Sequence, residues 1–182
     1  MQYGDKDLTG GIQIRCLQTI GDVEVEGLSD VLIDCVEGGA SVSFMLPMSR
    51  AKAEAFWHST SASVARGEQV LLAALDPAGA IVGTVQVVLD QPENQRHRGD
   101  IAKMLVHRRL RRQGVGAALL AAAEGRALEA GKTLLVLDTA SDDAERLYAR
   151  HGWQLCGEIP NYALMPDGRP CATTILFKSL RD

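Results

Sequence analysis

Hydrophobic and polar positions along the chain follow two periods, which predict strands and helices respectively. Alternating or continuous apolar residues are typical of strands, and they recur at 12–17, 69–75, 81–89, 100–107, 133–137, 153–159 and 172–179. Apolar positions three and four residues apart predict helices at 23–36, 49–65, 114–130 and 141–151. The resulting order is β-α-α-β-β-β-α-β-α-β-β. Because no repeat, linker or low-complexity stretch divides it, we expect one mixed α/β domain over residues 1–182.

Composition and charge narrow the function classes. The chain has 182 residues, of which 46% are hydrophobic and 23% are charged, as in an ordinary globular protein. A net charge of −4 argues against a general nucleic-acid binder, and no aromatic residues alternate with the basic ones to stack on bases. The basic residues are unevenly distributed, however. Four of them are arginines within residues 107–112, where they favour binding of a small anion.

The N-terminal residues and the cysteines carry no signal for export or metal binding. The first seven residues are polar and acidic, and no apolar run approaches the ~20 residues that span a bilayer. We therefore expect a cytoplasmic protein without membrane association. Cys16, Cys35, Cys156 and Cys171 lie far apart, so no metal site is expected. The apolar patterns around Cys16 and Cys35 indicate buried, inert thiols.

A basic loop with two glycines joins the predicted strand at 100–107 to the predicted helix at 114–130. It contains Arg111-Arg112-Gln113-Gly114-Val115-Gly116. The free N–H groups and the positive end of a helix N-terminus favour an anion. Glycines let phosphate oxygens approach the backbone without meeting a Cβ, and arginines add charge-assisted hydrogen bonds. The sequence therefore predicts an anion site at this junction.

Two common phosphate-binding motifs are excluded at this loop. The G-x-x-x-x-G-K-[ST] pattern of a P-loop is absent, and Leu119 stands where a dinucleotide fingerprint needs a glycine. The loop instead matches [R/Q]-x-x-G-x-[G/A], and in this respect the sequence resembles the GNAT N-acetyltransferase superfamily. Residues 144–153 are similar to the family's A-x-x-[LF]-Y-x-x-x-G-[FW] segment. The resemblance extends from Ile12 to Leu180 and includes the order of the elements.

The resemblance implies a fold, a reaction and a set of cofactor-binding residues. The fold is the GNAT fold, a mixed, mostly antiparallel and splayed sheet of six to seven strands with helices on both faces. The reaction is direct transfer of acetyl from acetyl-CoA to a primary amine, without a metal or a covalent enzyme intermediate. The implied cofactor-binding residues are Met104, Leu105 and Val106 for the pantetheine arm, Arg111, Arg112, Gln113, Gly114, Val115, Gly116 and Ala117 for the pyrophosphate, and Ser141, Ala144 and Tyr148 beside them. The family often has asparagine at the position of Ser141, so the sequence departs from the pattern there.

The same resemblance assigns the catalytic groups. Tyr148 stands where the family has its general acid, although a tyrosine on an amphipathic helix also fits a core position. Asp100 and Asp138 are candidates for the general base, or for binding the substrate ammonium. Asp100 also fits a solvent-exposed strand start. Four aromatic residues either line an acceptor pocket or pack in the core: Phe44, Trp57, Tyr162 and Phe177.

A finer likeness concerns the acceptor. Residues 38–45 and 157–169 are similar to the tabtoxin-resistance type of acetyltransferase, which suggests a small amine such as an amino-acid-like antibiotic of the tabtoxin β-lactam kind. Two alternatives remain: a non-catalytic acyl-CoA sensor, against which Tyr148 and Asp100 count, and a protein N-acetyltransferase, for which the sequence offers no extended acidic groove. A homodimer is left open, since many relatives pair.

Overall fold

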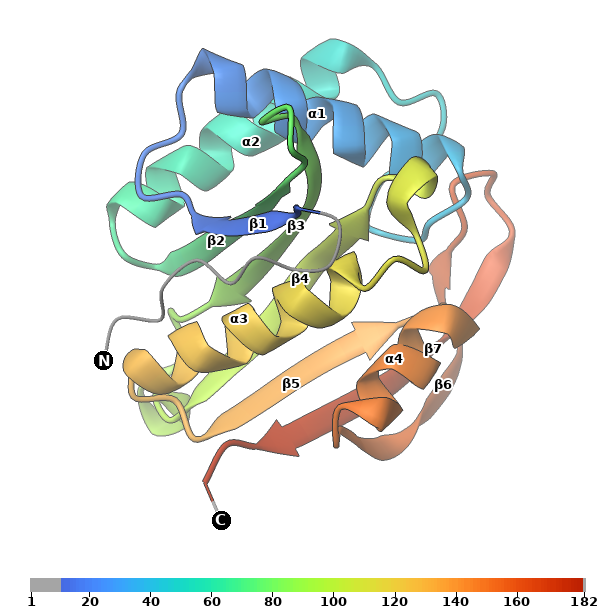
Figure 1. The fold of residues 1–182 in the computed structure, drawn as a ribbon. Helices are drawn as coiled ribbons and strands as arrows, with labels where there is room; N and C mark the ends of the chain where they lie inside the picture. The colour runs from blue at the N-terminus through green and yellow to red at the C-terminus, as the bar shows by residue number, and fades with distance from the viewer. Residues whose placement is uncertain (1–10, 182) are drawn as a thin grey trace.

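The structure is a computed structural model that describes residues 11–181, and its centre is one seven-stranded sheet (Figure 1). The strands lie in the order β1-β2-β3-β4-β5-β7-β6. In chain order they are β1 (Gln13–Cys16), β2 (Gln69–Leu75), β3 (Ile81–Val88), β4 (Arg98–Val106), β5 (Leu134–Thr139), β6 (Gln154–Leu164) and β7 (Pro170–Ser179). All neighbouring pairs are antiparallel except β4 and β5, which are parallel.

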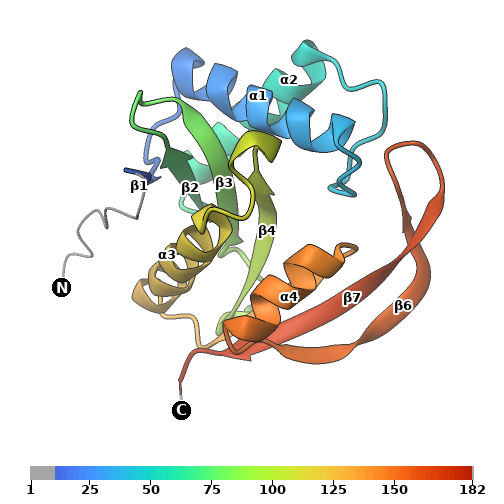
Figure 2. The same ribbon diagram turned by 45° about the vertical axis from the view of Figure 1, so that its right-hand side comes forward.

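Four helices cover both faces of this sheet. They are α1 (Asp22–Glu37), α2 (Arg50–Ala65), α3 (Val115–Glu129) and α4 (Asp142–Arg150), with short 3-10 turns η1 (Glu93–Gln95) and η2 (Arg108–Leu110). In Figures 1 and 2, α1 and α2 lie on one face and α3 and α4 on the other. Each face has its own hydrophobic core, one around Trp57 and Leu105 and one around Leu119 and Tyr148. Among residues 11–181, no helix is both long enough and apolar enough to cross a bilayer.

The sheet divides between β4 and β5. These strands pair only from Arg98 opposite Leu134 to Asp100 opposite Val136. Beyond that point the described residues form no further β4–β5 pair, although β4 continues to Val106 and β5 to Thr139. Figure 2 shows β6 and β7 curving away from β4. One edge of the second half of β4 is therefore left without a strand partner.

A bulge in β4 changes which face its side chains reach. The register with β3 shifts between Thr84 and Gln86, and Lys103 has a φ of +48°, in the left-handed region. Residues four apart on a regular strand share a face. Here Ile101 packs into the core with α3, whereas Leu105 packs into the core with α1 and α2. The bulge thus turns the end of β4 immediately before the basic loop.

The predicted fold class and element order are confirmed, and most predicted bounds agree within one or two residues. The main difference is β6, expected to end at residue 159 but extending to Leu164. Pro160 and Asn161 have turn chemistry, which favoured a loop there. In the structure they lie in a bulge of β6, where Asn161 has a φ of +55°. Because β6 is the edge strand, a missing N–H at Pro160 is tolerated.

Candidate active site

The basic loop between β4 and α3 is anchored to α1. The carboxylate of Asp34 accepts hydrogen bonds from the backbone N–H of Arg108, at 2.8 Å, and from its Nε, at 2.9 Å. These contacts lower the pKa of Asp34 against the opposing effect of its own burial. His107 Nδ1 lies 3.6 Å from the same carboxylate. Arg108 therefore serves to hold the loop against α1.

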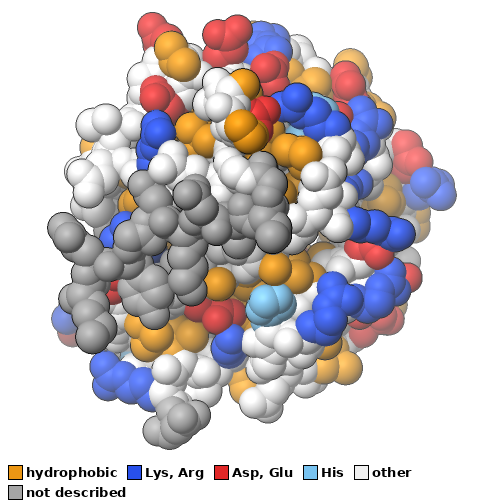
Figure 3. All heavy atoms as spheres, in the orientation of Figure 1, with side chains coloured by type: hydrophobic (Ala, Val, Ile, Leu, Met, Phe, Trp, Pro, Cys, Tyr) orange, Lys and Arg blue, Asp and Glu red, His pale blue; other side chains and the backbone are white. Residues whose placement is uncertain are grey.

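The second half of the loop has the geometry of an anion site. Arg112 and Gly114 have φ values of +62° and +85°, which turn the chain sharply into α3. The N–H groups of the first turn of a helix have no intrahelical partner, and no side chain caps this one. Arg111, Arg112, Gln113 and Gly114 are all exposed. Figure 3 shows basic side chains gathered over this loop and over α4.

Close packing explains the second glycine of the loop. A Cβ at Gly116 would lie 3.2 Å from Leu147 Cδ2, so α3 and α4 approach each other where only a glycine fits without adjustment. At the same junction, Arg112 Nη2 lies 3.6 Å from Asp143 in the first turn of α4. The loop, the start of α3 and the start of α4 therefore form one surface, with Ala117 half-buried behind it.

The end of β4 lies beside this loop. Leu105 and Val106 pair with β3 on one edge, opposite Thr84 and Gly83. The other edge, beyond the pairing with β5, offers backbone groups to an extended ligand. The carbonyl of Val106 accepts a hydrogen bond from Arg111 Nε at 3.2 Å.

The predictions for two cysteines have different outcomes. Cys35 is buried, and burial raises the pKa of its thiol, which agrees with the prediction of an inert thiol. Burial also raises the pKa of Cys16, which is only half-buried. Among residues 11–181, no group of His, Cys, Asp and Glu residues has an arrangement that could hold a metal ion.

Tyr148 lies on the buried face of α4. Ser141 begins this helix as its N-cap, and its Oγ accepts a hydrogen bond from Ala144 N at 3.4 Å. Tyr148 is 4% exposed and packs against Trp153, with ring centroids 5.7 Å apart. Burial, and secondarily the charge of Asp138, raises the pKa of its phenol, so the phenol is protonated at neutral pH.

Asp138 lines a small pocket at the divided end of the sheet. The pocket has a volume of about 360 Å³ and also involves residues of the α1–α2 loop and of the β6–β7 hairpin: Ser41, Ser43, Phe44, Met45, Tyr162, Ala163, Leu164 and Thr173. Thr173 Oγ1 lies at hydrogen-bond distance, 3.4 Å, from Asp138 Oδ2. Of the four aromatic residues singled out in the sequence, Phe44 and Tyr162 line this pocket, whereas Trp57 is fully buried in the core.

Asp100 has different neighbours. Its carboxylate lies 3.2 Å from Arg98 Nη1 and accepts a hydrogen bond from Gln91 Nε2 at 2.9 Å. It lies where β4 and β5 still pair, opposite Val136. The structure thus places Asp138 within electrostatic range of Tyr148, whereas Asp100 belongs to a polar network before the division of the sheet and does not line the pocket.

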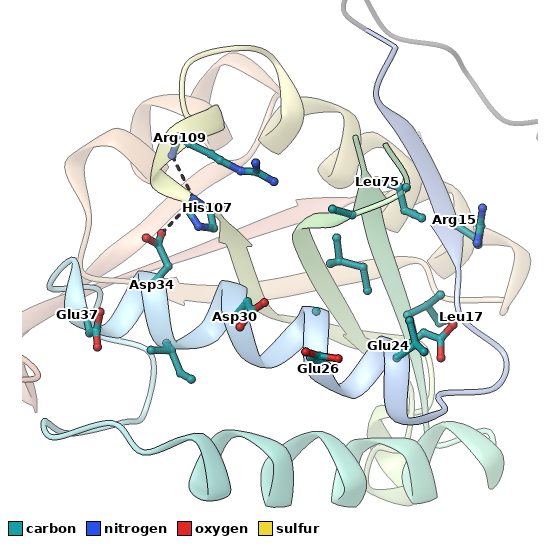
Figure 4. Close-up of a pocket in the computed structure, with 16 residues that line it drawn as sticks. Arg15, Leu17, Glu24, Glu26, Asp30, Asp34, Glu37, Leu75, His107 and Arg109 are labelled. Carbon is teal, nitrogen blue, oxygen red and sulfur yellow. Dashed lines mark hydrogen bonds and ion pairs between the residues drawn. The ribbon is translucent and has the colours of Figure 1, made fainter. Parts of the chain in front are cut away.

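A larger groove lies elsewhere, between α1, β1 and the β2–β3 turn (Figure 4). Its volume is about 720 Å³, and it is lined by five acidic residues of α1 together with His107, Arg109 and the β2–β3 turn. The acidic residues are Glu24, Glu26, Asp30, Asp34 and Glu37. The groove shares no lining residue with the pocket at Asp138. This acidic face was not predicted above. The recurrence of its residues at helical spacing along α1 is the signal in the sequence that could have indicated it.

Comparison with known proteins agrees with the fold described above. Among solved structures, the chain is similar to a phosphinothricin acetyltransferase from Sinorhizobium meliloti in complex with acetyl-CoA, with 18% identity, a TM-score of 0.76, and coverage of 92% of this chain and 88% of that chain. It is similar to a ribosomal-protein-alanine N-acetyltransferase from Brucella melitensis, with 20% identity, a TM-score of 0.75, and coverage of 91% and 98%. It is also similar to an N-acetyltransferase from Staphylococcus aureus Mu50, with 15% identity, a TM-score of 0.76, and coverage of 93% and 99%.

These structural likenesses concern the fold, and a match to a family model adds the family itself. The model of the acetyltransferase (GNAT) family matches residues 41–153, a span that runs from the α1–α2 loop through the basic loop to Trp153. The predicted superfamily and enzyme class are thereby confirmed. The chain belongs to the acetyltransferase (GNAT) family and is an acyl-CoA-dependent N-acetyltransferase.

Proposed function

We propose that this enzyme, acting as a single catalytic domain, transfers the acetyl group of acetyl-CoA directly to a primary amine of a small molecule. One arrangement carries the proposal: an anion-binding loop, an unpaired edge of β4 and a small pocket with a carboxylate meet where the sheet divides. Such a site has room for a phosphate-bearing donor on one side and an amine on the other.

The residues of the loop and of β4 fit this cofactor. The first N–H groups of α3 and the exposed Arg111 and Arg112 suit a pyrophosphate. Met104, Leu105 and Val106 offer backbone groups to the pantetheine arm, with Ser141 and Ala144 at the start of α4 beside them. When bound, acetyl-CoA supplies the activated acetyl thioester.

Two side chains would move protons. Asp138 takes a proton from the acceptor ammonium, directly or through water, and the neutral amine then forms the new N–C bond as the C–S bond breaks. Tyr148 donates its phenolic proton to the departing sulfur, and the second proton lost by the amine nitrogen on amide formation returns to the Tyr148 phenolate. Asp138 could act instead by binding the ammonium alone. Asp100 is the second candidate base, but its contacts with Arg98 and Gln91 make a positioning role the better-supported one.

The dimensions of the pocket favour a small acceptor. A volume of about 360 Å³ suits an amino-acid-sized molecule. We propose an amino-acid-like antibiotic, such as a tabtoxin-type β-lactam, and the similarity to a phosphinothricin acetyltransferase supports the same size class. The rival acceptor is a protein N-terminus, for which the similar ribosomal-protein-alanine N-acetyltransferase is the precedent. We place the reaction in the cytoplasm, where acetyl-CoA is available.

Thermal unfolding with separate additions of acetyl-CoA, CoA, NADH and ATP tests the cofactor class. A ligand at a hundredfold excess over its Kd stabilises the native state by about 2.7 kcal/mol. We expect a shift with the two CoA ligands only. Thiol release from acetyl-CoA with a panel of amines then tests the reaction. Binding of CoA without turnover on any amine or peptide would favour the acyl-CoA sensor, and turnover on peptides alone would favour the protein acetyltransferase.

We also propose that the chain forms a homodimer through β6. This edge strand carries four large exposed apolar side chains: Leu155, Ile159, Tyr162 and Leu164. An unpaired edge with exposed apolar residues favours association with another strand. Light scattering coupled to size-exclusion chromatography measures the mass, and Leu155→Lys should shift a dimer towards the monomer.

A further inference from the structure

Lys103 extends from the bulge of β4 towards the pocket at Asp138. Its Nζ donates a hydrogen bond to Ser43 Oγ at 3.2 Å, and Ser43 lines that pocket. The same Nζ lies 6.0 Å from the ring centroid of Phe44 and 5.7 Å from that of Phe56. An ammonium group is thus held between a hydroxyl and two aromatic rings, beside the pocket residues Ser43 and Phe44.

This position is unfavourable for a lysine. A φ of +48° favours glycine or asparagine over a long side chain. Burial lowers the pKa of Lys103, and the charge of Asp138 counteracts that effect only in part. Within the described part of the chain, no carboxylate forms an ion pair with Lys103. Among residues 11–181, the ammonium therefore lacks a close anionic partner.

Asp138, which lines the pocket, and Lys103, which lies beside it, carry opposite charges. Asp138 attracts a cation at the end of β5, and Lys103 attracts an anion from the bulge of β4. They interact through space without forming an ion pair among the described residues. Such a pair of sites is complementary to a molecule with an ammonium and an anionic group on one small frame.

We propose that Lys103, together with the hydroxyl of Ser43, binds an anionic group of the acceptor, so that the pocket selects amines that also carry a carboxylate or a similar oxyanion. Lys103 is then a specificity-determining residue. The inference rests on the proposed transfer to a small amine, and it adds a requirement for negative charge that the family assignment does not contain. Asp138 meets the ammonium, while Lys103 fixes the other end of the molecule.

Matched acceptors test this directly. We would measure kcat/KM for several α-amino acids, each beside its primary amide and its decarboxylated amine, with the unmodified enzyme and with Lys103→Met. Hydrogen bonds to charged groups lead us to expect a roughly 10- to 100-fold loss of kcat/KM for the carboxylate acceptors, and little change for amides and amines. Because both enzymes meet the same amines, differences in amine basicity cancel in the ratio. Lys103→Arg should retain the carboxylate preference.

Lys52 provides the control variant. Its Nζ lies 5.6 Å from the same Phe44 ring, but the side chain is exposed on α2 and forms no hydrogen bond or ion pair among the described residues. Lys52→Met removes a positive charge close to the pocket without removing the contact to Ser43. We expect it to keep the carboxylate preference, which separates a local anion site from a general effect of net charge.

A binding measurement separates failure of this inference from failure of the proposed reaction. Calorimetric titration of the same acceptors into enzyme saturated with CoA needs no turnover. Carboxylate-dependent binding that is lost in Lys103→Met supports the anion site, even when no amine releases thiol. The inference is overturned if the unmodified enzyme has no carboxylate preference, or if Lys103→Met keeps an unchanged preference. It is also overturned if Lys103→Met loses activity equally on all acceptors, since this would assign Lys103 to proton transfer.

Discussion

Asp138, at the end of β5, lies within electrostatic range of the buried phenol of Tyr148 on α4. Burial is the larger reason why the pKa of Tyr148 is raised, and the Asp138 carboxylate adds to it. One carboxylate therefore lines the pocket and also adds to the raised pKa of the proposed acid. In the proposed mechanism, this coupling links the group that accepts a proton from the amine to the group that donates one to the sulfur.

Removal of the Tyr148 hydroxyl should affect turnover more than cofactor binding. General acid catalysis typically contributes about 10²- to 10⁴-fold, so Tyr148→Phe should lower kcat by at least about 100-fold. The ring and its packing on Trp153 remain, so the Kd for acetyl-CoA should change little. Steady-state kinetics and calorimetric titration measure the two quantities. Unchanged turnover would remove Tyr148 from the chemistry.

The raised pKa of Tyr148 predicts two pH effects of definite sign. The folded protein holds the phenolic proton above pH 10, where the unfolded chain, with a pKa of about 10, has lost it. The folded state then binds more protons than the unfolded state, so the free energy of unfolding decreases as the pH rises above 10. Chemical denaturation across pH 9–11 should show this decrease, and Tyr148→Phe should reduce it. No loss of kcat below pH 10 should come from Tyr148.

Asn substitutions should distinguish the two aspartates. Asp138→Asn removes a carboxylate from the pocket, and a base role predicts a large decrease in kcat together with loss of the acidic limb of the pH–rate profile. Asp100→Asn weakens the contacts with Arg98 and Gln91, so we expect lower stability with the acidic limb retained. If Asp138→Asn kept that limb and Asp100→Asn lost it, the assignment would have to be reversed.

The sequence was most informative where local patterns determine structure. The period of the apolar residues was sufficient to predict the order of strands and helices, and the Arg111–Gly116 pattern predicted a helix N-terminus with exposed donors. The role of Lys103 could not be found in this way. A charged residue between Ala102 and Met104 fits an ordinary strand, and only the bulge shows that its side chain reaches Ser43.

The position of Asp100 illustrates the same limit. Its place in the strand before the basic loop is visible in the sequence, but its partners are not. Gln91 comes from the β3–β4 loop and is brought to Asp100 only by the hairpin. In the sequence, Asp100 and Asp138 are both candidates for the general base. Their surroundings differ because β4 and β5 stop pairing after Asp100, so that only Asp138 lies beyond the division of the sheet.

Two glycines in the same left-handed backbone conformation allow cofactor binding to be separated from stability. Gly114, in the anion-binding loop, and Gly131, after α3, have φ values of +85° and +80°, and an added Cβ would meet nothing within 4 Å at either position. Alanine in this conformation costs about 1–2 kcal/mol, so both Gly114→Ala and Gly131→Ala should lower Tm by a similar amount. Scanning calorimetry measures this shared effect.

Only Gly114→Ala should also weaken acetyl-CoA binding, because a methyl group there keeps phosphate oxygens away from the N–H groups that begin α3. We expect an increase in Kd of about tenfold, equivalent to the loss of one charge-assisted hydrogen bond, while Gly131→Ala retains the original Kd. Calorimetric titration at a temperature well below both Tm values keeps the two proteins folded during the comparison. An unchanged Kd in Gly114→Ala would show that the loop does not hold the pyrophosphate through its backbone. Equal weakening in both would attribute the effect to stability alone.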